Sequence, residues 1–125
     1  MNSRHTLLLR HCYSLSLFLS QLMNERGVRT TLCCHSSFAY CTDCNRIPED
    51  SMKVLTSLEI LVIDALRPTP HPTHFSLPET LALLAVLRPR SSYLIHMGHD
   101  LEHQETEKAL PESVRLAYDG LVLEF

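Results

Sequence analysis

Short apolar runs alternate with polar, turn-rich segments along most of the chain, a pattern typical of an α/β fold. The nearly continuous apolar run over residues 60–64 predicts a strand buried on both faces. Residues 28–34 and 38–42, rich in β-branched or aromatic side chains, predict two neighbouring strands, and residues 92–96 predict another.

A strong helix start lies between the last two of these runs. Ser76 can cap a helix, Pro78 suits its first turn, and Glu79 completes a capping box, which together predict a helix over residues 76–88. A strand, a helix and a second strand at this spacing form a βαβ unit, so the flanking strands are expected to be parallel.

The remaining segments carry weaker signals. The Asp119-Gly120 pair predicts a hairpin that joins strands at residues 114–118 and 121–125. Further helices are predicted at residues 7–25, 48–55 and 102–110.

Candidate chemistry follows three of the predicted strands. Asp43 comes after the strand at residues 38–42, His74 lies in the loop after residues 60–64, and His96 ends the last strand. Side chains at the carboxyl ends of parallel strands converge at one edge of a sheet. A carboxylate and two imidazoles there suit a divalent cation and proton transfer. The alternatives are a turn aspartate and histidines with no ligand.

Three nearby residues could support such a site. His99 lies three residues after His96 and could act from a second shell around a metal, and Asp64 could accept a hydrogen bond from a histidine. His71 shares a proline-stiffened loop with His74, which suits a catalytic acid or a phosphate contact. The alternatives are a solvated histidine at His99 and an exposed loop of prolines and histidines at residues 70–74.

The composition limits the kinds of binding partner and the cellular compartment that we expect. The chain has 125 residues, a formal net charge of −3 and a pI near 6.2, so no basic field predicts nucleic-acid or anionic-membrane binding. Five cysteines, an odd number, indicate reduced thiols and a cytoplasmic protein. The N-terminal apolar stretch has features of a signal peptide, but serines interrupt it and it is too short to span a bilayer.

The same residues carry a family resemblance. The chain resembles the C-terminal half of metallo-β-lactamase-fold hydrolases, with the PhnP-like phosphodiesterases as the most similar branch, over about residues 38–125. The matching segments are Tyr40-Cys41-Thr42-Asp43, residues 61–67, His71-Pro72-Thr73-His74-Phe75-Ser76, residues 93–100 (with His96-Met97-Gly98-His99-Asp100), residues 110–112 and Ala117-Tyr118-Asp119-Gly120.

This resemblance implies a fold, a cofactor and residue roles. The fold would be part of an αββα sandwich, about one sheet with its covering helices. Members of this branch bind two divalent ions, commonly zinc or manganese, and hydrolyse a small phosphodiester. By resemblance, Asp43 is a bridging metal ligand, His96 is the last histidine ligand, and His74 contacts the phosphate and can act as general acid.

The chain also departs from the family pattern. The motif His-x-His-x-Asp-His is absent, and so is the histidine expected about twenty residues before Asp43. Residues 1–36 are therefore expected to be a divergent, helical segment, and residues 37–125 the C-terminal half of the domain.

These observations lead to three functional hypotheses. The first is a truncated metal-dependent phosphodiesterase with reduced or no activity. The second is a non-catalytic fold remnant that forms a homo-oligomer, because the missing sheet would leave an apolar face exposed. The third is a small zinc or redox protein that uses Cys33, Cys34, Cys41 and Cys44.

Overall fold

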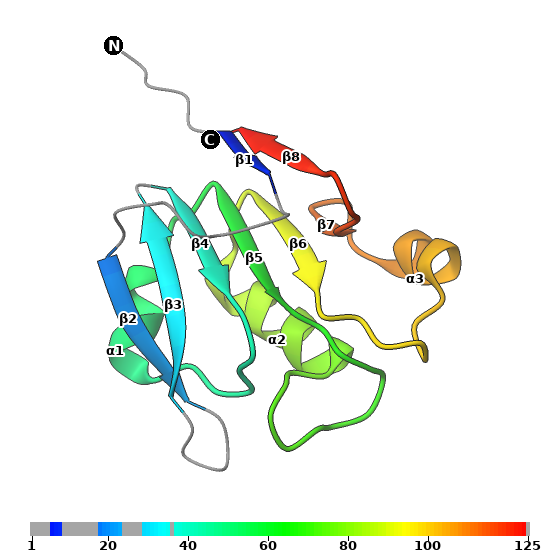
Figure 1. The fold of residues 1–125 in the computed structure, drawn as a ribbon, viewed down its shortest axis with the longest axis horizontal. Coiled ribbons are helices and arrows are strands. Elements are labelled where there is room, and N and C mark those ends of the chain that lie inside the picture. The colour runs from blue at the N-terminus through cyan, green and yellow to red at the C-terminus, as the bar shows by residue number, and fades with distance from the viewer. Residues whose placement is uncertain (1–5, 9–17, 24–28, 36, 125) are drawn as a thin grey trace.

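The computed structural model describes residues 6–8, 18–23, 29–35 and 37–124. Its α/β architecture consists of a six-stranded sheet, a separate two-stranded sheet and three helices (Figure 1). The elements are β1 (Thr6–Leu8), β2 (Phe18–Met23), β3 (Arg29–His35), β4 (Phe38–Cys41), α1 (Glu49–Val54), β5 (Ile60–Asp64), α2 (Leu77–Leu87), β6 (Ser91–Ile95), α3 (His103–Ala109), β7 (Val114–Leu116) and β8 (Val122–Glu124).

The large sheet has the order β2-β3-β4-β5-β6-β7. Strands β4 to β7 run parallel, whereas β2 and β3 pair antiparallel with each other and β3 pairs antiparallel with β4. The predicted parallel pairing across α2 is therefore confirmed. All five residues of β5 are buried, as the apolar run predicted for a central strand covered on both faces.

Helices α1 and α2 cover one face of this sheet (Figure 1). On that face Leu61, Ile63 and Leu94 of the sheet pack in one core with Leu84 and Leu87 of α2. The predicted capping box at the start of α2 is present, and the helix ends at a left-handed residue immediately before a proline. This core fixes the strands whose carboxyl ends carry the candidate site.

The opposite face of the sheet has a smaller apolar cluster. Phe38, Ile60 and Val62 pack there with Leu123 of β8, and the partly buried Tyr93 borders them. The face is thus covered in part by the two-stranded β1–β8 sheet. Within the described ranges, no helix has the length and apolar character needed to cross a membrane.

The helix predicted over residues 7–25 is wrong for the described part of that range. Residues Phe18–Met23 form β2, which pairs with β3 along its whole length, and β1 lies in the other sheet. Six ladder pairs with β3 outweigh the weak amphipathic pattern that favoured a helix. The division of the chain at residues 36 and 37 stays a prediction, although the β3–β4 pair continues across it.

The predicted C-terminal hairpin is also wrong. The turn itself forms, with Gly120 at a φ of 92° and the Leu121 amide donating to the Tyr118 carbonyl. However, β7 pairs parallel with β6, and β8 pairs antiparallel with β1. Because each strand buries its apolar side chain against a partner distant in sequence, the local turn does not set the pairing.

Candidate metal centre

Three polar side chains lie at the carboxyl edge of the parallel strands. Asp43 follows β4, His96 follows β6 directly, and His74 comes from the loop between β5 and α2. Asp43 and His96 both have left-handed backbones, with φ of 56° and 57°. Aspartate and histidine tolerate this conformation better than most residues, and it turns the chain sharply at the end of each strand.

The three side chains form a cluster of metal-ligating atoms. His74 Nε2 lies 3.0 Å from Asp43 Oδ1, and His96 Nε2 lies 3.6 Å from the same oxygen. One ligand atom from each residue falls within 4.8 Å of the others, and the two imidazole centroids are 5.3 Å apart. The convergence expected from the strand order is therefore present.

The loop that carries His74 is fastened to the segment after β4. The Phe75 amide donates to the Cys44 carbonyl at 2.9 Å, and the Asn45 side-chain amide donates to the carbonyls of His71 and Pro72. These bonds join the loop to the chain next to Asp43. These contacts hold the backbone of the loop next to the segment that carries Asp43.

Asp43 is half-exposed, which limits what its ion pairs contribute to stability. Its side chain is 50% exposed, whereas that of His74 is 19% exposed. Exposed pairs of this kind contribute about 0–1 kcal/mol because water screens them. The cluster is therefore better explained by ligand binding or proton transfer than by stabilisation of the fold.

Asp64 lies beneath the cluster and is completely buried. Its Oδ2 accepts a hydrogen bond from the Cys44 amide at 2.9 Å, whereas Oδ1 has no partner among the described residues. Burial raises the pKa of Asp64 to about 7, although that hydrogen bond and the nearby His96 lower it. Asp64 thus holds the turn that presents Asp43, and its partner is a backbone amide instead of the histidine that the sequence suggested.

His99 is not part of this cluster. Its side chain is 98% exposed, and its Nε2 lies 3.4 Å from Asp100 of the same turn. Its supporting role stays a prediction.

Sequence reasoning overlooked Thr73. Its hydroxyl oxygen lies 2.8 Å from His74 Nδ1 and 3.2 Å from His71 Nδ1, and its amide donates to the same His71 nitrogen at 3.2 Å. The only available signal was its place between two histidines, because a threonine alone does not indicate which rotamer it adopts.

The buried cysteines do not have the properties of a zinc site. Cys41 and Cys44 have no exposed surface, and burial raises the pKa of the Cys44 thiol well above its usual range. Among the described residues, neither thiol belongs to a group of metal-ligating atoms. The side chains of Cys33 and Cys34 lie outside the described residues.

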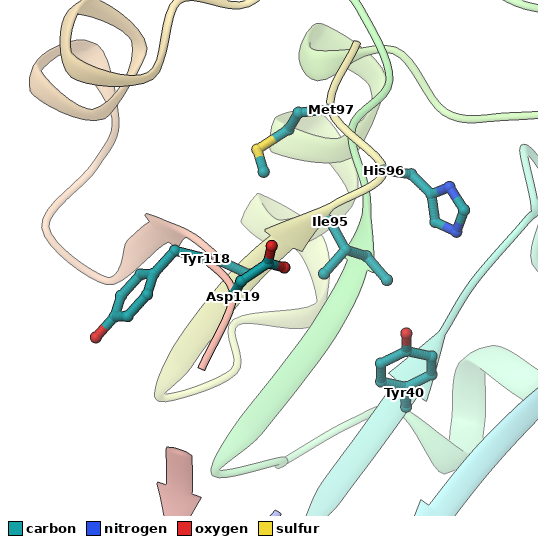
Figure 2. Close-up of a pocket in the computed structure, with 7 residues that line it drawn as sticks. Tyr40, Ile95, His96, Met97, Tyr118 and Asp119 are labelled. Carbon is teal, nitrogen blue, oxygen red and sulfur yellow. The ribbon is translucent and has the colours of Figure 1, made fainter. Parts of the chain in front are cut away.

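A pocket of about 270 Å³ adjoins the cluster. Figure 2 shows His96 and Tyr40 on one side of Ile95, with Tyr118 and Asp119 on the other. The pocket thus combines one imidazole of the cluster with a carboxylate and two aromatic rings, and it opens at the same edge of the sheet.

Comparisons with known proteins agree with this geometry. The sequence model of a beta-lactamase superfamily domain matches residues 27–97, which include all three residues of the cluster. A new diphosphatase from the PhnP family is 37% identical in sequence, with a TM-score of 0.84 over 90% of this chain and 45% of that chain. No match was found among curated proteins.

Two more distant structures share the fold alone. The metallo-beta-lactamase fold protein YhfI from Bacillus subtilis is 13% identical, with a TM-score of 0.65 over 87% of this chain and 49% of its own. The short form of human tRNase Z is 14% identical, with a TM-score of 0.61 over 90% of this chain and 45% of its own. The chain therefore spans about half the length of the structures it matches.

Proposed function

The chain belongs to the beta-lactamase superfamily and has part of a metallo-β-lactamase fold, and we propose that it is a metal-dependent hydrolase of small phosphate esters. The observation that carries this proposal is the cluster of Asp43, His74 and His96, whose ligand atoms lie within 4.8 Å of one another. The similarity to a PhnP-family diphosphatase supports a phosphate ester as the substrate class.

The donor set fits one divalent ion. The Asp43 carboxylate and the His96 imidazole are oxygen and nitrogen donors of the kind that zinc and manganese accept, and His74 next to them is left to carry a proton. Zinc or manganese held by Asp43 and His96 would polarise a phosphoryl oxygen and supply Lewis-acid chemistry. The described residues provide no second set of this kind.

His74 is the proposed proton donor. Its Nε2 faces Asp43 Oδ1 at 3.0 Å, so a proton on that nitrogen lies at the centre of the cluster. In the hydrolysis of a phosphate ester, a water oxygen would bond to phosphorus, and the His74 proton would pass to the leaving oxygen as its bond to phosphorus breaks. The fastened loop would keep the imidazole in place during the transfer.

The pocket next to His96 would hold the organic part of the substrate. The Asp119 carboxylate can accept hydrogen bonds from hydroxyl groups, and Tyr40 and Tyr118 offer aromatic surface. A hydroxylated, ring-containing group therefore matches the pocket best. Because Cys44 is a buried free thiol, we also propose that the protein works in the cytoplasm.

A second candidate function is a non-catalytic homo-oligomer. It is favoured by the apolar sheet face opposite α1 and α2, where Tyr40, Tyr93 and Ile95 are only partly buried. A second copy of the chain packed on this face would bury these side chains.

Metal content and turnover distinguish the two functions. The purified protein is loaded with zinc or manganese, desalted and assayed with bis-p-nitrophenyl phosphate, alongside Asp43→Ala and His74→Gln. The exposed His103→Ala serves as the matched control. About one equivalent of metal, lost in Asp43→Ala, and turnover lost in both site variants support the hydrolase. A stable oligomer with neither metal nor turnover would support the second candidate instead.

A further inference from the structure

Thr73 lies between the two histidines of the β5–α2 loop and contacts both imidazoles. Its hydroxyl oxygen is 2.8 Å from His74 Nδ1 and 3.2 Å from His71 Nδ1. The opposite nitrogen of the His74 ring, Nε2, is the one that faces Asp43. Thr73 thus holds the side of the His74 imidazole that points away from the reacting groups.

We infer that Thr73, with His71 behind it, is a positioning residue that holds the His74 imidazole with Nε2 directed at the reacting centre. This inference rests on the proposed role of His74. It assigns a role to Thr73 and His71, which do not belong to the cluster of metal-ligating atoms.

The chemistry of the three groups explains why a hydroxyl suits this position. The Thr73 amide donates to His71 Nδ1, so that nitrogen carries a lone pair and no proton. When His74 Nδ1 lacks a proton, the Thr73 hydroxyl can donate to it. When His74 Nδ1 carries a proton, the hydroxyl oxygen can accept a hydrogen bond from it and turn its own hydrogen toward His71 Nδ1.

A proton that leaves Nε2 does not change the proton on Nδ1, so the hydrogen bond between Thr73 and His74 persists through the transfer. A side chain that could only donate could not accept from the Nδ1–H of the imidazole. His71 supplies an acceptor for the hydroxyl hydrogen while the hydroxyl oxygen accepts from His74. The Asn45 side chain fixes this arrangement by donating to the carbonyl of His71 at 3.2 Å.

The surroundings favour a fixed geometry. His71, Thr73 and His74 are all partly buried, whereas Asp43 and His96 are exposed. The two histidine rings lie edge to face at 65° with centroids 5.4 Å apart, and the hydroxyl lies within hydrogen-bond distance of the Nδ1 atom of each ring. Supporting residues of this kind typically change activity about 10- to 100-fold when they are replaced.

The test compares Thr73→Val, which keeps the shape and loses the hydroxyl, with Thr73→Ser, which keeps the hydroxyl. Thr69→Val, at an exposed threonine of the same loop, is the matched control. We expect Thr73→Val to lower kcat for bis-p-nitrophenyl phosphate about 10- to 100-fold, with KM and bound metal unchanged. Thr73→Ser restores most of the loss, and His71→Phe lowers kcat in the same direction.

A spectroscopic measurement keeps the outcome independent of turnover. The ring nitrogens of His74 are observed by ¹⁵N NMR and assigned from their absence in His74→Gln. We expect Thr73→Val, and not Thr69→Val, to shift the Nδ1 resonance of His74. An unchanged Nδ1 resonance in Thr73→Val would overturn the inference. Wild-type protein without turnover, but with the expected Nδ1 shift, would instead contradict the proposed function and leave the positioning contact standing.

Discussion

Replacement of Asp64 tests whether a buried carboxylate organises the site from below. Asp64 has no exposed surface, and its carboxylate accepts a hydrogen bond from the Cys44 amide at 2.9 Å. That amide immediately follows Asp43, so the bond fixes the turn that presents this ligand. We compare Asp64→Ala, which removes the acceptor, with Asp64→Asn, which keeps an oxygen at the same place and removes the charge.

The expected magnitudes follow from the hydrogen bond and from burial. In Asp64→Ala the buried Cys44 amide loses its partner, which costs about 1–3 kcal/mol, and the cavity adds to this cost. For a chain of this size that corresponds to a fall in Tm of about 3–6 °C per kcal/mol. In Asp64→Asn the amide keeps an acceptor, so most of this loss is avoided.

The charge adds a pH dependence with a definite sign. Burial raises the pKa of Asp64 in the folded protein to about 7, above its value in the unfolded chain. This difference in pKa adds to the free energy of unfolding. The added stability is complete below about pH 4 and is lost as the pH rises through about 7. Asp64→Asn lacks this loss, so in metal-free protein its stability relative to wild type should rise across that range.

Urea unfolding in EDTA, at several pH values between 4 and 8, measures these differences. The half-exposed Asp100→Asn is the control, because its carboxylate lies in an exposed turn. Two results would refute the reasoning. One is equal stability of Asp64→Ala and Asp64→Asn, which would show that the Cys44 amide does not need its partner. The other is a stability difference between Asp64→Asn and wild type that does not change with pH.

Three further substitutions probe the scaffold around the site. Ser76→Ala removes the cap of α2 and should lower the free energy of unfolding by about 1 kcal/mol in urea titrations, and no change would contradict the capping box. Thr80→Val removes the bond from the buried Thr80 hydroxyl to the Asp64 carbonyl and should cost about 0.5–1.5 kcal/mol, which Thr80→Ser should largely recover in the same assay. Gly98→Ala would place a methyl group 3.1 Å from the Leu66 carbonyl oxygen, so we expect the turn after β6 to be displaced. The variant should then retain less metal after desalting, and an unchanged metal content would show that this turn does not position His96.

Local signals were sufficient for the central elements. The apolar run of β5 and the Ser76–Glu79 capping box each lie within a few residues, so the sequence alone predicted β5, α2 and the parallel pair that α2 connects. The meeting of Asp43, His74 and His96 followed from the same elements, because parallel strands bring their carboxyl ends to one edge.

The two errors have different causes. Strand β8 is held by β1 at the other end of the sequence, so this pairing has no local signal. Strand β2 pairs with the next strand of the chain, β3, and the error arose because a short apolar run does not distinguish a helix from a strand. The position of the Thr73 hydroxyl between two imidazoles depends on side-chain rotamers, which cannot be predicted from a single sequence.

The backbone at the two exposed residues of the cluster links the fold to the chemistry. Left-handed conformations at Asp43 and His96 cost roughly 1–2 kcal/mol each relative to ordinary backbone, and they persist only where neighbouring contacts enforce them. Next to Asp43 that contact is the Cys44 amide bound by Asp64, and after His96 it is the Gly98 amide, which donates to the Leu66 carbonyl at 2.7 Å. Because both contacts lie beneath the cluster and involve no ligand, the fold itself holds the carboxylate and the imidazole in a binding geometry. Ser57 and Arg88 are left-handed as well, so the conformation alone does not mark a binding site. What distinguishes Asp43 and His96 is that each stands at the carboxyl end of a parallel strand, which brings both side chains to one edge of the sheet.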